Sequence, residues 1–368
     1  MSFDASALAN AVTRSLRAYD PGHDLPALRR RFGTALAELG SNENPLGPSP
    51  RAVAAIETAL PEILRYPDPK GLALKTGLAR HLAVEIGQIT LGNGSHELLM
   101  LIAQCFADAS VSVAFSEFGF AVFPIATAAA GARAIRVPAL ARDHATMPLG
   151  HDLDAIAAAI RPDTRTVYLA NPNNPTGTWF DDAALEQFLA RVPATTLVVV
   201  DEAYAEFVTA PGLTSALQFL PRYSNLVVTR TFSKAYALAG LRVGYAISSA
   251  QVAAIFERLR ESFNVNSLAL AAAEAALADQ AHVAKGRDWN LAEREWFSGQ
   301  LRARGLRVLP SQTNFVLVDF ARDAAPIERA LFERGVIARP MGGYGLAECL
   351  RISVGARTEN ERLLETLP

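Results

Sequence analysis

A lysine that directly follows a serine stands where packing alone does not explain it. Lys234 comes one residue after Ser233 and eight residues before Arg242, and it lies 33 residues after Asp201, an acid that ends an apolar run. A lysine amine can hold an aldehyde, and a carboxylate can pair with a protonated ring nitrogen. Serine and arginine side chains suit a phosphate group. Together these residues indicate a site for pyridoxal phosphate.

Each of these residues also has an ordinary structural explanation when it is taken alone. Lys234 could be a surface lysine, Arg242 a salt-bridge residue, and Asp201 the cap of the next segment. However, a carboxylate at the tip of a buried strand is costly without a partner, and a protonated pyridine nitrogen is such a partner. The hydroxyls of Thr231 and Ser233 would complete an anion site beside Arg242. The combination favours the cofactor hypothesis.

A glycine-rich turn at residues 92–97 precedes an apolar helix pattern at residues 98–106. The free N–H groups at the start of a helix carry a partial positive charge, so they can bind a phosphate. An N-cap at Ser95 without any ligand is the structural alternative. The third glycine of a dinucleotide-binding fingerprint is absent, because Glu97 stands at its position. We expect the turn at Ser95 and His96 to be a second anchor for the phosphate.

Three further side chains could contact the ring of such a cofactor. Asn174 and Tyr204 can each donate a hydrogen bond to its phenolic oxygen, and Phe118 offers a flat face for stacking. A simple turn at the Asn-Pro-Thr-Gly sequence and a core role for Phe118 are the alternatives.

Short apolar runs alternate with helical patterns in the middle of the chain. Residues 111–115, 166–170, 196–200 and 226–229 are typical of buried strands, and residues 153–160 and 182–190 of helices. This alternation predicts an α/β fold with a mainly parallel central sheet sandwiched by helices. The candidate residues follow the ends of three of these strands, at the edge where open α/β sheets bind their ligands.

The pattern changes after about residue 248. Long helical patterns at residues 251–261, 268–279 and 283–304 precede strand-like segments at 313–319, 336–339 and 350–354. This part predicts a smaller α+β domain. We expect a large cofactor-binding domain over residues 46–248, and a small domain from residues 1–45 plus 249–368 that includes an N-terminal arm.

The composition of the 368 residues is that of an ordinary globular enzyme, with half of the residues apolar and a fifth charged. A net charge of −2 gives no reason to expect nucleic acid or an anionic membrane as a partner. Two cysteines cannot build a disulfide framework, and the six histidines lack metal-ligand spacing, so we expect no metal. We found no pattern of a signal peptide or a membrane span, and we expect a cytoplasmic protein.

Longer stretches resemble one enzyme family, nearly from end to end. The segments that look like a fold-type I aminotransferase are residues 174–177, 201–204, 232–245 and 350–355. The segments that resemble the histidinol-phosphate aminotransferases more narrowly are residues 18–22, 41–48, 65–67 and 263–267.

The resemblance implies a role for each matching residue. Lys234 would hold the cofactor and then move a proton between the substrate carbon and C4′ of the cofactor. Asp201 would bind the pyridine nitrogen, Phe118 would stack on the ring, and Asn174 and Tyr204 would hold its oxygen. The residues that would hold the phosphate are Ser95, His96, Ser233 and Arg242, with Tyr66 of the neighbouring subunit. A homodimer with shared active sites is therefore implied.

Arginines are implied for the substrate pocket. Arg351 would bind the carboxylate of glutamate and the phosphate of histidinol phosphate in turn, with Arg339 and Tyr19 beside it. A guanidinium group accepts either anion. The resemblance thus implies amino transfer between L-histidinol phosphate and 2-oxoglutarate, which gives imidazole-acetol phosphate and L-glutamate in histidine biosynthesis.

Three positions depart from the usual family pattern. His96 stands where an acidic residue is usual, Phe118 where a tyrosine is common, and Ser116 where a proline is common. Two related activities stay open, namely transamination of aromatic amino acids and decarboxylation of threonine phosphate. A ligand sensor without catalysis is an alternative from another class, and the joint presence of Lys234, Asp201 and Arg242 argues against it.

Overall fold

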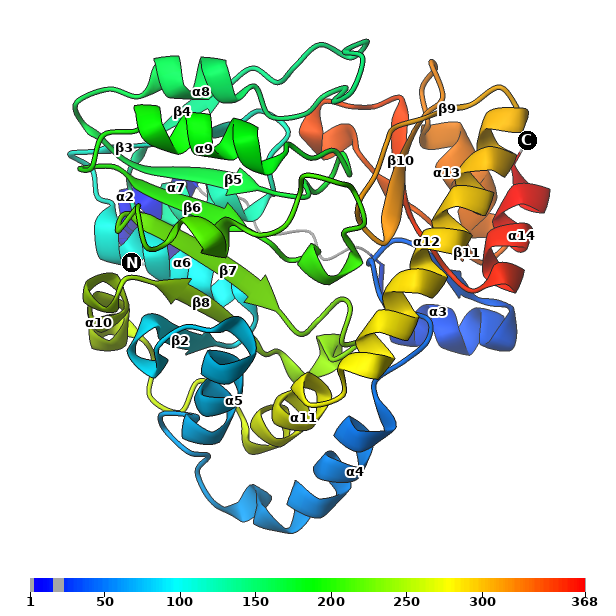
Figure 1. Ribbon diagram of the computed structural model, residues 1–368. Helices are drawn as coiled ribbons and strands as arrows, with labels where there is room; N and C mark the ends of the chain where they lie inside the picture. The colour runs from blue at the N-terminus through cyan, green and yellow to red at the C-terminus, as the bar shows by residue number, and fades with distance from the viewer. Residues whose placement is uncertain (1–2, 16–22, 368) are drawn as a thin grey trace.

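The computed structural model describes residues 3–15 and 23–367, and its centre is a seven-stranded sheet (Figure 1). The strand order is β2-β8-β7-β6-β5-β3-β4. The strands are β2 (Ile89–Gly92), β3 (Ser112–Ser116), β4 (Arg133–Val137), β5 (Thr164–Ala170), β6 (Leu197–Asp201), β7 (Leu226–Thr231) and β8 (Gly244–Ser248). β8 runs antiparallel to both of its neighbours, and the pairs from β7 through β4 are parallel. The predicted α/β class with a mainly parallel sheet is confirmed.

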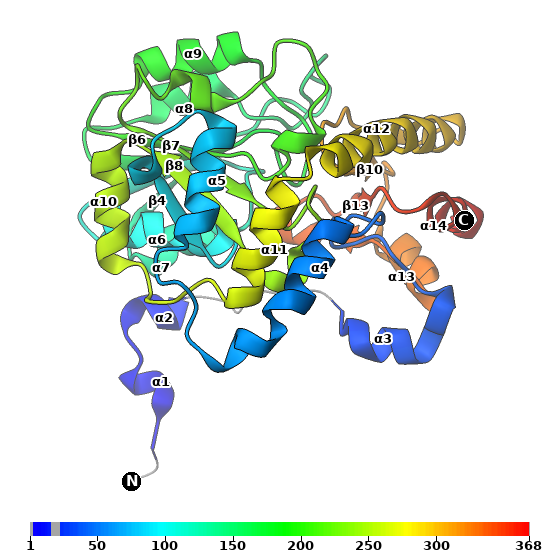
Figure 2. The same cartoon turned by 60° about the horizontal axis from the view of Figure 1, so that its bottom comes forward.

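Helices cover both faces of this sheet (Figures 1 and 2). One face packs against α6 (Ser95–Phe106), α7 (Val122–Ala129) and α10 (Ala250–Leu259). The other face packs against α5 (Leu72–Leu82), α8 (Leu153–Ala159), α9 (Asp182–Arg191) and α11 (Ser267–Leu277). Because both faces are buried, β6 is apolar over four successive residues and ends in Asp201 without any alternation.

The carboxyl ends of the central strands lie side by side. In the β5–β6 pair Ala170 is opposite Asp201, and in the β6–β7 pair Asp201 is opposite Thr229. The segments that follow these strands therefore start from one edge of the sheet, as predicted.

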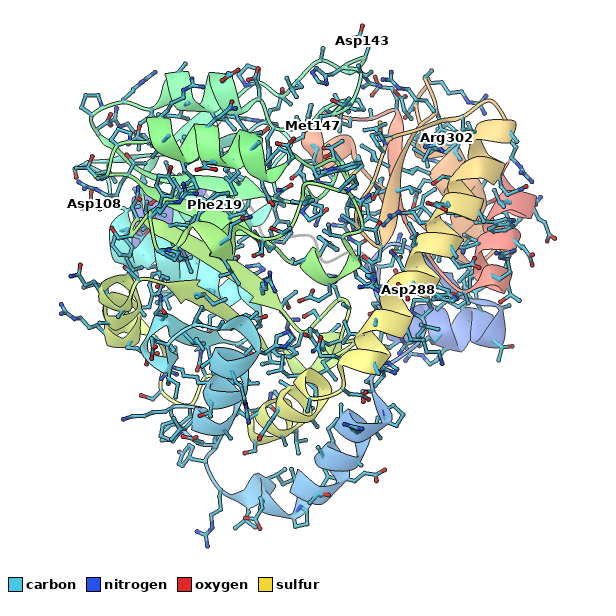
Figure 3. The ribbon with its side chains drawn as sticks, viewed as in Figure 1. Asp108, Asp143, Met147, Phe219, Asp288 and Arg302 are labelled. Atoms are coloured by element: carbon cyan, nitrogen blue, oxygen red, sulfur yellow. The ribbon has the colours of Figure 1, made fainter. Side chains whose placement is uncertain are left out.

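A second lobe is built from the C-terminal part of the chain and an N-terminal arm. Its antiparallel sheet has the order β12-β13-β10-β9, made of β9 (Arg307–Val308), β10 (Phe315–Asp319), β12 (Arg339–Pro340) and β13 (Cys349–Ser353). Its helices are α3 (Leu25–Phe32), α12 (Gln280–Ala303), α13 (Ala325–Glu333) and α14 (Arg357–Thr366). Asp288 and Arg302 lie along α12, which reaches from the large lobe to the small one (Figure 3).

The arm is joined to the small lobe through its backbone. β1 (Ala37–Glu38) pairs in parallel with β11 (Val336–Ile337). The helices α10 and α11, by contrast, pack against the large sheet, although the expected division gives them to the small domain. The domain boundaries themselves stay a prediction.

Three helices remain at the N-terminal side, namely α1 (Ala5–Leu8), α2 (Ala11–Ser15) and α4 (Pro50–Ala59). α2 contacts α7, whereas α4 packs against α11 (Figure 2). Within residues 3–15 and 23–367, no helix is long and apolar enough to cross a membrane.

Candidate active site

A pocket of about 340 Å³ lies at the carboxyl edge of the central sheet, where both lobes and the arm meet. The predicted site residues that line it are Ser95, His96, Asn174, Asp201, Tyr204, Ser233, Lys234, Arg242, Arg339 and Arg351. Residues predicted separately from strand ends, a glycine-rich turn and the C-terminal region are therefore brought to one cavity.

Lys234 is half-buried in this pocket, and its Nζ donates a hydrogen bond to the main-chain oxygen of Ser41 at 3.0 Å. Burial, followed by the nearby positive charge of Arg351, lowers the pKa of Lys234 to about 8. An amine with this pKa is partly neutral near physiological pH, so it can react with an aldehyde.

Asp201 is 4% exposed at the end of β6, and its Oδ1 accepts a hydrogen bond from the hydroxyl of Thr229 at 2.8 Å. Burial raises the pKa of Asp201 to about 7. A buried carboxylate is stabilised by a cationic partner. The protonated nitrogen of a pyridine ring has the charge and the size for this position.

Tyr204 is oriented by Asn42, for which no role was predicted. The side-chain nitrogen Nδ2 of Asn42 donates to the hydroxyl oxygen of Tyr204 at 2.8 Å. Burial raises the pKa of Tyr204 to about 12, so the hydroxyl keeps its proton. Because its oxygen accepts from Asn42, the Tyr204 hydroxyl can donate its proton into the pocket.

Asn42 has no local signal of its function, since 162 residues separate it from Tyr204. Its side chain is fully buried, and its φ of 57° lies in the left-handed region that asparagine tolerates better than most residues. Only the folded structure brings it to the site.

Asn174 is held by the small lobe. Its Oδ1 accepts a hydrogen bond from Nη1 of Arg351 at 2.7 Å. The amide nitrogen is therefore the group of Asn174 that can donate to a ligand in the pocket. Arg351 also donates through Nη2 to the main-chain oxygen of Gly40 at 2.6 Å.

Two arginines lie side by side on adjacent strands of the small sheet. Arg339 on β12 is the register partner of Arg351 on β13, and both line the pocket. The guanidinium of Arg351 lies over the ring of Phe315 at 5.3 Å. This pair puts a positive charge at the side of the pocket opposite the central sheet, where an anionic substrate group can bind.

A second anion site lies at the start of α6. The hydroxyl of Thr231 donates to Oγ of Ser233 at 3.0 Å, and Nη1 of Arg242 donates to the same oxygen at 3.3 Å. Gly94 has a φ of 85°, and a Cβ added there would lie 2.6 Å from Nη2 of Arg242. A side chain at residue 94 would therefore displace the guanidinium group of Arg242 from its present position.

The backbone around α6 is equally close-packed. A Cβ added at Gly244 would lie 2.7 Å from the main-chain nitrogen of Ser95. Burial, and then the charge of Arg242, lower the pKa of His96, so its ring stays neutral near pH 7. Main-chain N–H groups at a helix start, two hydroxyls and a guanidinium together fit a phosphate group.

Two of the predicted residues that the structure describes do not line the pocket. Phe118 is 8% exposed and packs in a cluster with Leu317 and Met341, whereas Phe120 from the same loop lines the pocket. Stacking of Phe118 on a cofactor ring stays a prediction. Tyr66 is 82% exposed and stacks on Phe263, with ring centroids 4.7 Å apart. Tyr19 lies outside the described residues.

Among residues 3–15 and 23–367, no group of three or more His, Cys, Asp or Glu side chains is arranged to hold a metal ion. The chemistry of the pocket is instead that of an amine, a buried carboxyl and two separate anion sites. This combination defines a pyridoxal-phosphate enzyme whose substrate carries an acidic group.

Comparisons with known proteins agree with this class. A family model described as aminotransferase class I and II matches residues 34–367. The chain is 50% identical to histidinol-phosphate aminotransferase 2 of Pseudomonas aeruginosa. The match extends over 367 residues, which are 99% of this chain and 98% of that protein. It is 46% identical to histidinol-phosphate aminotransferase 1 of Thiobacillus denitrificans. This match extends over 365 residues, which are 98% of this chain and 93% of that protein.

Among solved structures, the chain is similar to a histidinol-phosphate aminotransferase from Sinorhizobium meliloti in complex with pyridoxal-5′-phosphate. The two share 34% identity and a TM-score of 0.89, over 100% of this chain and 97% of that one. The chain belongs to the aminotransferase class I and II family. It is a pyridoxal-phosphate-dependent aminotransferase of fold type I.

The raised pKa of Asp201 predicts a pH dependence of stability in the cofactor-free protein. Its pKa of about 7 lies above the ordinary 3.8, so the folded state retains a proton that the unfolded chain releases. The resulting stabilisation is complete below about pH 4 and is lost as pH rises through about 7. Relative to Asp201→Asn, the free energy of unfolding should fall by roughly 2–4 kcal/mol over this range. Denaturant unfolding at several pH values measures this, and parallel curves for the two proteins would contradict it.

Proposed function

We propose that this aminotransferase moves the amino group of L-histidinol phosphate to 2-oxoglutarate, which gives imidazole-acetol phosphate and L-glutamate. The observation that carries the proposal is the arginine pair Arg339 and Arg351 in the same pocket as Lys234. Identities of 43–50% to relatives named histidinol-phosphate aminotransferase, over 96–100% of this chain, support the choice of amino donor. The reaction would belong to histidine biosynthesis.

Two residues of the large lobe act directly on the reaction. Pyridoxal phosphate, when bound, supplies an electron sink for the bond that breaks at the substrate α-carbon. Lys234 would hold the aldehyde of pyridoxal phosphate, and its neutral amine would move a proton between the substrate α-carbon and C4′ of the cofactor. Asp201 keeps the ring nitrogen protonated through an ion pair.

The remaining large-lobe residues orient the cofactor. Tyr204 and Asn174 donate hydrogen bonds to the ring oxygen, in the directions that Asn42 and Arg351 leave free. Phe118 is proposed to stack on the ring. The phosphate is held by the residues Ser95, His96, Ser233 and Arg242.

The two half-reactions use one anion site in turn. Arg351 binds the phosphate of the amino donor in one half and a carboxylate of glutamate or 2-oxoglutarate in the other. A planar guanidinium forms paired hydrogen bonds with either group. Arg339 adds positive charge, and Tyr19 is proposed to contribute to the same substrate pocket.

We also propose a homodimer in which Tyr66 binds the cofactor phosphate of the partner subunit. The exposed position of Tyr66 supports this, because it does not line the pocket of its own chain. The neighbouring exposed apolar side chains are Leu60, Ile63, Leu64, Leu72 and Phe263. Exposed apolar groups in such number are typical of a surface that a partner covers. A cytoplasmic location stays a prediction.

The amino donor is tested with a panel of substrates. Histidinol phosphate, phenylalanine and phosphothreonine are each supplied with 2-oxoglutarate, and glutamate and CO₂ are measured. We expect glutamate from histidinol phosphate with the highest kcat/KM and no CO₂. Preferred use of phenylalanine would replace the proposed donor, and CO₂ from phosphothreonine would replace the reaction type.

Arg351→Ala should weaken both half-reactions. Loss of a charge-assisted pair to the substrate anion should raise the KM for histidinol phosphate and for 2-oxoglutarate by about 10–100-fold. The amount of cofactor retained after gel filtration should stay unchanged. Loss of the cofactor instead would remove Arg351 from the substrate pocket.

Lys234→Ala should abolish turnover while the protein still holds cofactor through its phosphate. We expect kcat to fall by at least about 10³-fold, because the proton carrier is removed. Lys285→Ala, an exposed lysine on α12, is the control and should keep normal activity. Near-normal kcat in Lys234→Ala would disprove the assigned role.

A mixed dimer tests the shared site. Tyr66→Ala chains, which should be weakly active alone, and Lys234→Ala chains, which should be inactive alone, are unfolded together and refolded as hybrids. If Tyr66 acts on the partner's cofactor, one site of each hybrid has both residues intact, so activity should return. If Tyr66 acts within its own chain, or if the protein is monomeric, mixing should recover nothing.

A further inference from the structure

One short turn of the N-terminal arm contacts the site side chains of both lobes. We call residues 38–42 the arm turn. The main-chain oxygen of Ser41 accepts from Nζ of Lys234 at 3.0 Å, and that of Gly40 accepts from Nη2 of Arg351 at 2.6 Å. Asn42 follows directly and donates to Tyr204. The amine that holds the cofactor and the arginine proposed for the substrate anion therefore share one support.

Glu38 closes this turn. Its Oε1 accepts a hydrogen bond from the main-chain nitrogen of Gly40 at 3.1 Å and another from Oγ of Ser41 at 3.2 Å. Glu38 is itself held in β1, where it is the register partner of Ile337. The carboxylate thus links the small-lobe backbone to the two residues whose carbonyls contact Lys234 and Arg351.

The approach of this carboxylate to the turn is close. A Cβ added at Gly40 would lie 3.1 Å from Oε1 of Glu38, so the geometry suits a glycine there. Because one oxygen accepts from two successive residues, the orientation of the peptide groups around Gly40 is restricted. A different orientation would turn the Gly40 and Ser41 carbonyls away from their present donors.

Stability alone does not explain an acid at this position. Oε2 of Glu38 is buried and has no hydrogen-bond partner among the described residues. Burial, followed by the charge of Glu43, raises the pKa of Glu38, which shows that the environment opposes its charge. A buried acceptor without a partner costs about 1–3 kcal/mol, a cost that an alanine would avoid.

We propose that Glu38 is a positioning residue for the reaction. By closing the arm turn, it holds Lys234 and Arg351 at the spacing at which one substrate reaches both. The inference rests on the proposed function in one respect, namely that Arg351 binds the substrate anion. Glu38 acts through hydrogen-bond acceptance by Oε1, so an amide oxygen in the same place can replace it.

The test compares Glu38→Ala with Glu38→Gln in the holoenzyme. Succinate serves as a non-reacting dicarboxylate, and its Kd is read from the change in cofactor absorbance. Glu38→Ala should raise this Kd and the KM for 2-oxoglutarate about tenfold, which corresponds to about 1.4 kcal/mol. Glu38→Gln keeps the acceptor and should stay within about twofold of the unmodified enzyme.

The control is Glu328→Ala. A second cavity of about 280 Å³ is lined by both Glu38 and Glu328. Glu328 pairs with His23 there and makes no hydrogen bond to the arm turn within the described part of the chain. Its loss should leave the succinate Kd unchanged. A normal succinate Kd in Glu38→Ala, or an equal defect in Glu38→Ala and Glu38→Gln, would overturn the proposal.

Ser41→Ala provides a second variant of the arm turn. If Glu38→Ala fails to fold, Ser41→Ala removes one of the two bonds to Oε1 and should weaken succinate binding by about two- to threefold, since a hydrogen bond contributes about 0.5 kcal/mol or more. An unchanged Kd there would likewise overturn the proposal. The Kd of succinate and the KM for 2-oxoglutarate do not depend on which amino donor the enzyme uses. The role of Glu38 is therefore tested independently of the proposal that histidinol phosphate is the donor.

Discussion

Burial of two ionisable groups in one pocket is the constraint on which the rest of the structure depends. It raises the pKa of Asp201 and lowers that of Lys234, so both groups are driven toward their neutral forms. A ligand that brings a protonated ring nitrogen to the acid and an aldehyde to the amine satisfies both. The central sheet makes this possible, because a buried strand ends at Asp201 and the adjacent strand leads to Lys234.

The pocket is completed by elements that are distant in the chain. The large lobe supplies the amine, the acid and the phosphate site, while the small lobe supplies Arg351 and Arg339. The hydrogen bond from Arg351 to Asn174 joins the two lobes at the proposed substrate site, and the bond from Arg351 to Gly40 joins β13 to the arm. An anion that binds Arg351 therefore acts on the same contacts that hold the lobes together, which links substrate binding to the geometry around the cofactor.

Parts of this arrangement follow from local patterns. The predicted strands at 166–170 and 226–229 lie within β5 and β7, because strands buried on both faces are continuous β-branched and apolar runs. Lys234, Asp201 and Arg242 were predicted as a set, because each alone has an ordinary structural explanation and only their combination favours a cofactor site. The strand β8 at residues 244–248 was not among the predicted strands, and neither was its antiparallel course.

The sequence by itself determined the fold class and the cofactor chemistry, and it predicted candidate residues that the structure brings to one pocket of the large lobe, because these depend on short-range order along the chain. Only the tertiary structure decided that Asn42 orients Tyr204, that Phe120 rather than Phe118 lines the pocket, and that Glu38 closes the arm turn. Arg351 and Gly40 are 311 residues apart, and Asn42 and Tyr204 are 162 apart. Contacts at such separations are set by how β1, β13 and the central sheet pack in space, and no spacing in the chain encodes that packing.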